Sequence, residues 1–166
     1  MTNYDENDQN SIANFINNNL ARHTQFAIGT IDDNGKPWVV CVNLTVDQKF
    51  NFIWKSQKTS EHSKYILKRP AVSICVFSET EDIGDFGYYC QAVAHEVNDE
   101  EELKKLLDIR FKQKGKPVPP IEEFLGESNT SLYYAEVSDA WVNDSRHLKV
   151  SVDLKTLSSF PNGNGI

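Results

Sequence analysis

The stretch that decides the fold runs from residue 26 to residue 46 and reads FAIGTIDDNGKPWVVCVNLTV. Two runs rich in β-branched and aromatic residues flank the pair Asn34-Gly35. Asn and Gly tolerate the positive φ angles of tight hairpin turns, so this pattern predicts two antiparallel strands joined by a turn. We expect a third strand over 50–55, after a turn at 47–49, to complete an antiparallel meander.

Strands and helices alternate along the rest of the chain. Apolar residues recur at three- and four-residue steps over 8–21, which predicts an amphipathic helix, and a second helix over 60–69 is ended by Pro70. A third helix begins after Asn98-Asp99, whose side chains are good N-caps. Further strands are expected over 71–77, 86–97, 131–142 and 147–154. This alternation favours a closed or partly closed antiparallel barrel over a parallel α/β sheet.

Length and charge limit the classes of function. The chain has 166 residues, about one domain, and we expect one unit over 1–166 whose core covers about 22–154 between polar termini. A formal net charge of −7 argues against a nucleic-acid partner. The sequence holds no apolar run of roughly 18 residues and no signal-like start, so we expect a cytoplasmic protein that does not enter a membrane.

Cysteines and histidines give little sign of metal or redox chemistry. Three widely spaced cysteines, Cys41, Cys75 and Cys90, are expected to be reduced, buried thiols. The four histidines form no metal-ligand pair with a nearby Cys or His, and we expect no metal site.

The basic side chains are concentrated in one segment. Between Trp54 and Pro70 the formal charge is +4, although residues 79–102 contain nine acids and no Lys or Arg. Hydroxyl side chains occur in the same segment, where a strand passes into a helix: Ser56, Thr59, Ser60 and Ser63. A helix N-terminus and hydroxyl groups together can bind a phosphate. The alternative is that Ser60 is only an N-cap and the lysines form a solvated face.

Four segments, in this order and spacing, resemble one protein family: 24–38, 52–56, 60–62 and 69–73. The chain resembles the pyridoxamine 5'-phosphate oxidase-related split-barrel flavoproteins over residues 22–103, and more loosely over 131–153. The resemblance implies a mainly β fold, a six-stranded antiparallel Greek-key split barrel. It also implies a homodimer that holds flavin mononucleotide (FMN) in a groove shared by the two subunits.

The resemblance also suggests which residues bind the cofactor. Ser56 and Ser60 match positions that bind the FMN phosphate, and His62 stands where the family usually has Lys. Lys55 would lend its backbone or its charge to the flavin ring or the phosphate. Gln91 lies near a flavin-contacting position that Gly87 takes. Trp54 shares the strand face of Ser56, where it either borders the flavin groove or packs in the core.

Other positions depart from the family pattern. Val40 and Thr45 stand where the oxidases place Arg and Lys, and Glu61 stands where they often have Arg. The leading hypothesis is an FMN-binding oxidoreductase that acts on an unknown small molecule. The alternative is a non-enzymatic split-barrel dimer, with a binding or stress-related role, that has lost flavin. Oxidation of pyridoxamine 5'-phosphate itself would need a second phosphate site, for which Arg146 and His147 are the only candidates.

Overall fold

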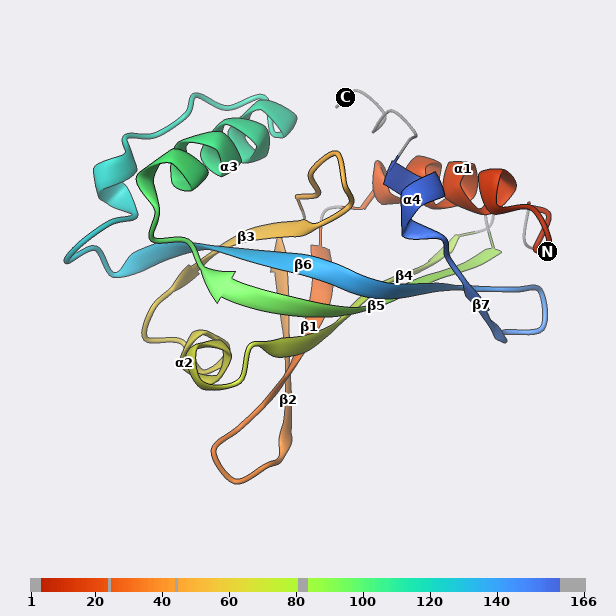
Figure 1. The fold of residues 1–166 in the computed structure, drawn as a ribbon, viewed down its shortest axis with the longest axis horizontal. Coiled ribbons are helices and arrows are strands. Elements are labelled where there is room, and N and C mark those ends of the chain that lie inside the picture. Colours follow the sequence, from red (N-terminus) through yellow and green to blue (C-terminus); the bar gives the residue numbers. More distant parts are fainter. Residues whose placement is uncertain (1–3, 24, 44, 81–83, 159–166) are drawn as a thin grey trace.

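In the computed structural model, which describes residues 4–23, 25–43, 45–80 and 84–158, seven strands form one antiparallel sheet (Figure 1). The strands are β1 (Gln25–Ile31), β2 (Pro37–Asn43), β3 (Phe52–Gln57), β4 (Ala71–Thr80), β5 (Gly84–Glu96), β6 (Thr130–Asn143) and β7 (Lys149–Ser151). Their order is β2-β1-β4-β5-β6-β3, and β7 pairs with β6. The predicted mainly β, antiparallel architecture is confirmed, but the sheet has seven strands rather than six and does not close.

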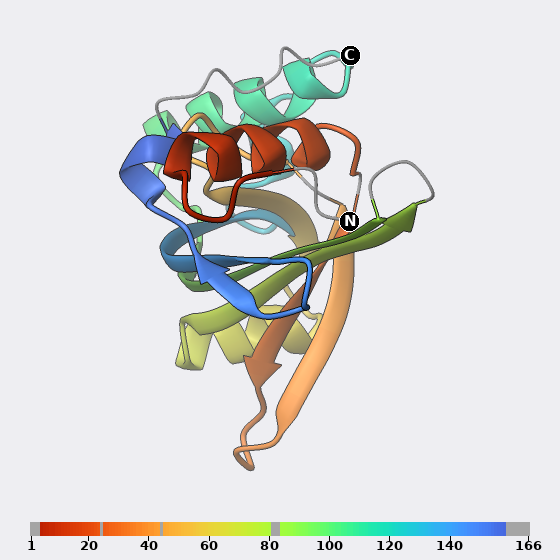
Figure 2. The same ribbon diagram turned by 90° about the vertical axis from the view of Figure 1, so that its right-hand side faces the viewer.

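Helices cover the sheet from both sides. They are α1 (Gln9–Leu20), α2 (Glu61–Lys68), α3 (Glu100–Gln113) and α4 (Leu154–Ser158), with a short 3-10 turn at Ile121–Glu123. Figures 1 and 2 show α1, α3 and α4 on one side of β5 and β6 and α2 on the other. The three helices that the sequence predicts over 8–21, over 60–69 and after 98–99 are confirmed. The Asp99 side chain caps α3 by accepting a hydrogen bond from the Glu102 N–H, at 2.9 Å.

The hairpin between β1 and β2 forms where the sequence predicts it. Ile31 pairs with Pro37, and the Asp32 N–H donates to the Lys36 carbonyl at 2.8 Å. In this turn only Gly35 has a positive φ, 80°. A left-handed glycine after the turn residues is typical of hairpin loops longer than two residues, so Asn34 does not need the positive φ that a two-residue turn would require.

Two strand predictions are wrong. The expected meander does not form, because β3 pairs along its whole length with β6, and its link to the chain after β2 is the isolated bridge Val46–Phe52. Residue 44, inside the strand predicted over 37–46, lies outside the described residues. The strand predicted over 147–154 is reduced to β7, and the chain then turns into α4.

The pairing of β3 with β6 buries this part of the sheet on both faces. Trp54 lies in the main core, which the apolar face of α1 covers, whereas Ile53 packs with Leu103 and Leu107 of α3 in a second cluster. Each of these side chains is fully buried, and burial of one large apolar side chain contributes roughly 1.5–3 kcal/mol. The first half of β3, just before the predicted phosphate site, is therefore held by the core on both faces.

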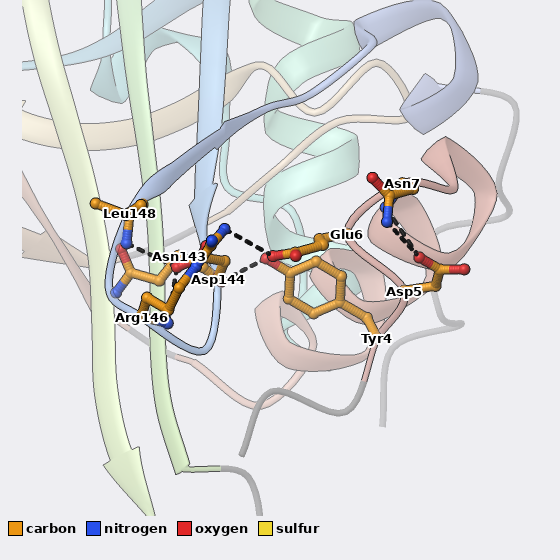
Figure 3. A network of polar contacts seen from close by, with 8 residues as sticks. All are labelled: Tyr4, Asp5, Glu6, Asn7, Asn143, Asp144, Arg146 and Leu148. Atoms are coloured by element: carbon orange, nitrogen blue, oxygen red, sulfur yellow. Dashed lines mark hydrogen bonds and ion pairs between the residues drawn. The ribbon is translucent and has the colours of Figure 1, made fainter.

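A polar cluster ties the start of the chain to the turn between β6 and β7 (Figure 3). The Tyr4 hydroxyl donates to the Asn143 carbonyl at 2.5 Å. The Arg146 guanidinium donates twice to Asp144 Oδ2, at 2.9 and 2.6 Å, and lies 3.6 Å from Glu6. The polar ends 1–3 and 159–166 lie outside the described residues.

The three cysteines differ in exposure. Cys90 is buried and Cys75 half-buried, but Cys41 is exposed because β2 is an edge strand, so the prediction of three buried thiols is wrong for Cys41. All three are free thiols. Among the helices of the described ranges, none combines the length and the apolar character needed to cross a membrane.

Candidate functional site

A tight turn connects β3 to α2 and positions the predicted phosphate site. The Ser60 N–H donates to the Gln57 carbonyl at 3.1 Å, and the Lys58 N–H donates to the Asn129 carbonyl at 2.9 Å. The helix then starts with the bond from the Lys64 N–H to the Ser60 carbonyl, at 3.1 Å. Three residues, 58–60, thus carry the chain from the end of β3 to the start of α2.

The turn brings together three of the predicted site residues. Ser56 Oγ lies 2.6 Å from His62 Nε2, and Ser60 Oγ lies 3.3 Å from the same nitrogen. The two hydroxyl oxygens are 3.4 Å apart. Ser56 and Ser60 are half-buried and His62 is buried, so solvent reaches the cluster from the side of the two serines.

The N-terminus of α2 is not capped by Ser60. Ser60 holds the N-cap position with an extended backbone, but its hydroxyl donates to the Gln57 carbonyl at 2.8 Å instead of accepting from the helix. The first-turn N–H groups of a helix have no partner within the helix and carry a partial positive charge. Together with the two hydroxyls, they form an arrangement suited to a phosphate group.

The cluster contains no lysine or arginine. Within the described residues, the nearby lysines pair with carboxylates: Lys58 lies 3.5 Å from Glu96, Lys64 3.1 Å from Glu61, and Lys68 2.7 Å from Asp33. Lys55 is exposed and, by strand alternation, points away from Ser56. Glu61 is already counted in the formal +4, so Glu96 and Asp33, from distant segments, offset two of these four positive charges.

His62 is uncharged in this setting. Burial lowers the pKa of the His62 imidazole below its ordinary value of 6.5, so the ring is neutral at pH 7. Sequence inspection places His62 where the family has Lys, but only the structure reveals that the nitrogen contacts Ser56.

Trp54 packs in the core and does not border an open groove. Its ring is 0% exposed, and it stacks on Tyr133 with the ring centroids 5.6 Å apart. On this face of the β3–β6 pair, the buried polar atoms that have no hydrogen-bond partner among the described residues include Trp54 Nε1 and Ser131 Oγ. Ser131 pairs with Ser56 across the two strands. A polar layer that sequence reasoning missed thus lies beneath the cluster.

Gln91 lies elsewhere on the sheet. It is exposed on β5, opposite Ser73 of β4, and its neighbour on β6 is Asp139. The β6 residues opposite Ser56 and Gln91, Ser131 and Asp139, are separated by roughly 25 Å of extended strand. A single chain therefore does not bring Gln91 to the Ser56 cluster.

Gly87 is buried, and neighbouring side chains fill the space beside it. A Cβ at position 87 would lie 2.6 Å from the Tyr89 hydroxyl and 2.7 Å from Asn143 Nδ2. A glutamine at this position would require both neighbours to move.

Two other departures from the family pattern also have a structural setting. Val40 packs against the main core, and Thr45 is buried. The Thr45 hydroxyl accepts a hydrogen bond from Arg110 Nη1 of α3, at 3.0 Å. A cation thus reaches position 45 from α3, but the same nitrogen also donates to the Ile53 carbonyl at 3.1 Å.

Comparison with known families agrees with this fold. The family described as "Pyridoxamine 5'-phosphate oxidase" matches residues 12–140. The chain belongs to the pyridoxamine 5'-phosphate oxidase family. No curated protein sequence matches this chain.

Several solved structures are similar to this family member. A heme binding protein from Mycobacterium smegmatis has a TM-score of 0.65 at 14% identity, over 92% of this chain and 60% of that chain. The heme storage protein HutZ from Vibrio cholerae has a TM-score of 0.59 at 16% identity, over 73% of this chain and 87% of that chain. A candidate pyridoxamine 5'-phosphate oxidase from Listeria innocua has a TM-score of 0.62 at 10% identity, over 81% of this chain and 99% of that chain. At these identities the likeness extends to the fold alone.

Proposed function

We propose that this protein is an FMN-binding oxidoreductase, a cytoplasmic homodimer that acts on a small molecule. The observation that carries the proposal is the convergence of Ser56, Ser60 and His62 at the uncapped start of α2, in a chain of this family. Bound FMN would supply the redox chemistry, because a flavin can accept and donate hydride or single electrons.

The cluster provides donors that fit a phosphate group. When a phosphate binds, the Ser60 hydroxyl would turn away from the Gln57 carbonyl, and with the Ser56 hydroxyl and the first-turn N–H groups of α2 it would hold the phosphate oxygens. The orphaned Ser131 Oγ and Trp54 Nε1 beneath them are both able to donate and need an acceptor, such as an anionic oxygen or a water. The cluster would orient the cofactor, and the core on both faces of β3 would keep it rigid.

One exposed sheet face supports the proposed dimer. The strand registers place apolar side chains of β2, β4 and β5 on the face that also carries Gln91: Val39, Phe77 and Val93, which are 64%, 56% and 53% exposed. We name Val39, Phe77, Gln91 and Val93 the outer sheet face. Exposed apolar residues that gather on one face are typical of protein interfaces. A second copy seated there would bring its own Ser56 cluster and Gln91 into the assembly.

The proposal is tested by titrating purified protein into FMN and following the quenching of flavin fluorescence. We expect wild type to bind FMN and the double variant Ser56→Ala, Ser60→Ala to bind at least about tenfold more weakly, since two hydrogen bonds to a charged group are lost. Thr59→Ala is the matched control, because Thr59 is an exposed hydroxyl residue of the same turn. Absence of binding by wild type would refute the proposal.

Two other functions have support. The lack of a lysine or arginine in the cluster favours the non-enzymatic dimer that has lost flavin. Heme binding is the other, because the Mycobacterium smegmatis and Vibrio cholerae proteins are described as heme binding and heme storage proteins. An absorbance spectrum of freshly purified protein separates the three functions, through flavin bands, a heme Soret band or neither.

Oxidation of pyridoxamine 5'-phosphate itself is not part of the proposal. Its second phosphate site would rest on Arg146 and His147, and the Arg146 guanidinium is engaged by Asp144 at 2.6 Å and lies 3.6 Å from Glu6. Two carboxylates beside the guanidinium offset the positive charge that a phosphate would need. We expect no pyridoxal 5'-phosphate in a direct turnover assay.

A further inference from the structure

The hydroxyl groups around His62 already form hydrogen bonds within the turn and the start of α2. Ser60 Oγ lies 2.8 Å from the Gln57 carbonyl, which can only accept, so the Ser60 proton is used there. Ser60 Oγ is also in position to donate to Ser63 Oγ, 2.8 Å away, so two groups of the same turn and helix start compete for its one proton. Between Ser56 Oγ and the neutral His62 Nε2, at 2.6 Å, a single proton is shared. The cluster is a closed set of donors and acceptors with no excess positive charge.

Among the described residues, the groups that face His62 from other elements add no free cation. From β6 come Ser131 and the phenol of Tyr133, whose pKa is raised by burial, so it is neutral. Lys58 of the turn is paired with Glu96 of β5, at 3.5 Å. On α2 itself, Lys64 is paired with Glu61, at 3.1 Å. Burial alone is the cause of the lowered His62 pKa.

A phosphate dianion placed between Ser56 and Ser60 would sit beside this buried ring. An opposite charge within about 4–6 Å favours the charged form of an imidazole, and burial strengthens the attraction. We infer that His62 takes up a proton when a phosphate-bearing ligand binds between Ser56 and Ser60, so that binding at this site is coupled to proton uptake. The inference rests on the proposed function for the identity of the ligand, FMN.

The coupling gives the affinity a defined pH dependence. His62 is neutral in the free protein at pH 7 and imidazolium in the complex, so the complex binds one more proton. The affinity then falls as the pH rises between the two pKa values, by up to about tenfold per pH unit. A lysine at position 62 would be charged in both states and would remove this dependence.

The experiment measures the FMN dissociation constant by fluorescence quenching from about pH 7 to about pH 8.5, where the phosphate, with a second pKa of about 6, stays dianionic. For wild type we expect the constant to rise by roughly three- to tenfold per pH unit. His62→Gln, which retains a hydrogen-bonding amide without a titrating group, should give a constant that does not change with pH. His62→Lys should also be insensitive to pH and should bind more tightly than wild type at the upper end of the range.

Matched measurements separate this inference from the proposed function. Wild type that binds FMN with a pH-independent constant overturns the proton coupling and leaves the proposed function standing. Riboflavin, which has the flavin ring without the phosphate, should show no pH dependence; the same dependence as FMN would also overturn the coupling. Urea unfolding shows whether both variants fold. If His62→Lys does not fold, the comparison of wild type with His62→Gln is enough to test the coupling.

A second probe tests the ring directly and does not depend on flavin. Inorganic sulfate is a dianion throughout the range, and NMR of the His62 ring nitrogens reports its protonation. We expect sulfate to raise the pKa of His62 and to leave the NMR signals of the His95 ring, on β5, where they are without sulfate. If FMN fails to bind but sulfate raises the His62 pKa, the proposed function is wrong and the coupling stands. If sulfate binds without changing that pKa, the coupling is wrong.

Discussion

At the scale of single residues, Asp144 shows how one carboxylate can fix a turn, here the turn between β6 and β7. It is buried, and it accepts hydrogen bonds from the Arg146 side chain and from the N–H groups of Arg146 and Leu148, both at 2.8 Å. Desolvation acts to raise the pKa of Asp144, but these hydrogen bonds outweigh it and lower the pKa from 3.8 to about 2. The ionised form therefore stabilises the fold above about pH 4, and this contribution is lost as the pH falls through about 2.

The variant Asp144→Asn tests this contribution. It keeps a side-chain oxygen but removes the charge, so it should have a lower urea midpoint than wild type at neutral pH. The difference should narrow as the pH falls from about 4 to about 2, because wild type then loses the same charge. Asp139→Asn, an exposed aspartate of β6, is the control and should change stability by less than about 0.5 kcal/mol. A difference between Asp144→Asn and wild type that stays constant with pH would contradict the assignment.

At the scale of elements, Arg110 fixes α3 to the chain between β2 and β3. It is 5% exposed, and its Nη1 donates to the Thr45 hydroxyl and to the carbonyls of Ile53 and Asn43, at 3.0, 3.1 and 3.4 Å. Burial lowers the pKa of Arg110 to about 10, so it remains charged at pH 7. No carboxylate forms an ion pair with it in the described part of the chain, and the three neutral acceptors stabilise the charge.

Arg110→Met should destabilise the protein by roughly 2–3 kcal/mol, because it leaves buried acceptors without a donor while replacing the stem of the side chain. The free energy of unfolding in urea measures this loss. Lys112→Met, on the exposed side of the same helix and paired with Asp108 at 2.8 Å, should cost less than about 1 kcal/mol. Equal losses in the two variants would show that Arg110 does not bridge these elements.

The elements also show what a sequence can predict. Helices α1, α2 and α3 and the hairpin at Gly35 follow from local signals such as apolar spacing, the Asp99 cap and turn residues. The pairing of β3 with β6 depends on which apolar faces can be buried together. The residues near Phe52 give no local indication of this pairing. Five-residue α4 carries too short a pattern to be recognised, and its place depends on packing against α1.

At the scale of the whole molecule, the candidate site was predictable in part. Ser56, Ser60 and His62 meet because they lie within seven consecutive positions that pass from a strand through a turn into a helix, which is local information. The ion pairs that neutralise Lys58 and Lys68 involve Glu96 and Asp33, which only the folded sheet brings near. Burial, which makes His62 neutral, likewise depends on how α2 packs against the sheet.

Under the proposed function, the separation between Gln91 and the Ser56 cluster would require a second copy of the chain to bring both to one flavin. If Gln91 contacts the flavin across the outer sheet face, the variant Val39→Glu, Val93→Glu should be monomeric, since it places buried charges in an apolar interface. Light scattering after size exclusion measures the mass. Both side chains are more than half exposed in the chain, so the variant should remain folded. Leu148→Glu, an exposed apolar residue of the β6–β7 turn, is the control and should stay dimeric.

The monomeric variant retains Ser56, Ser60 and His62, and it should nevertheless bind FMN more weakly than wild type. A monomer with full FMN affinity would mean that one chain forms the whole site.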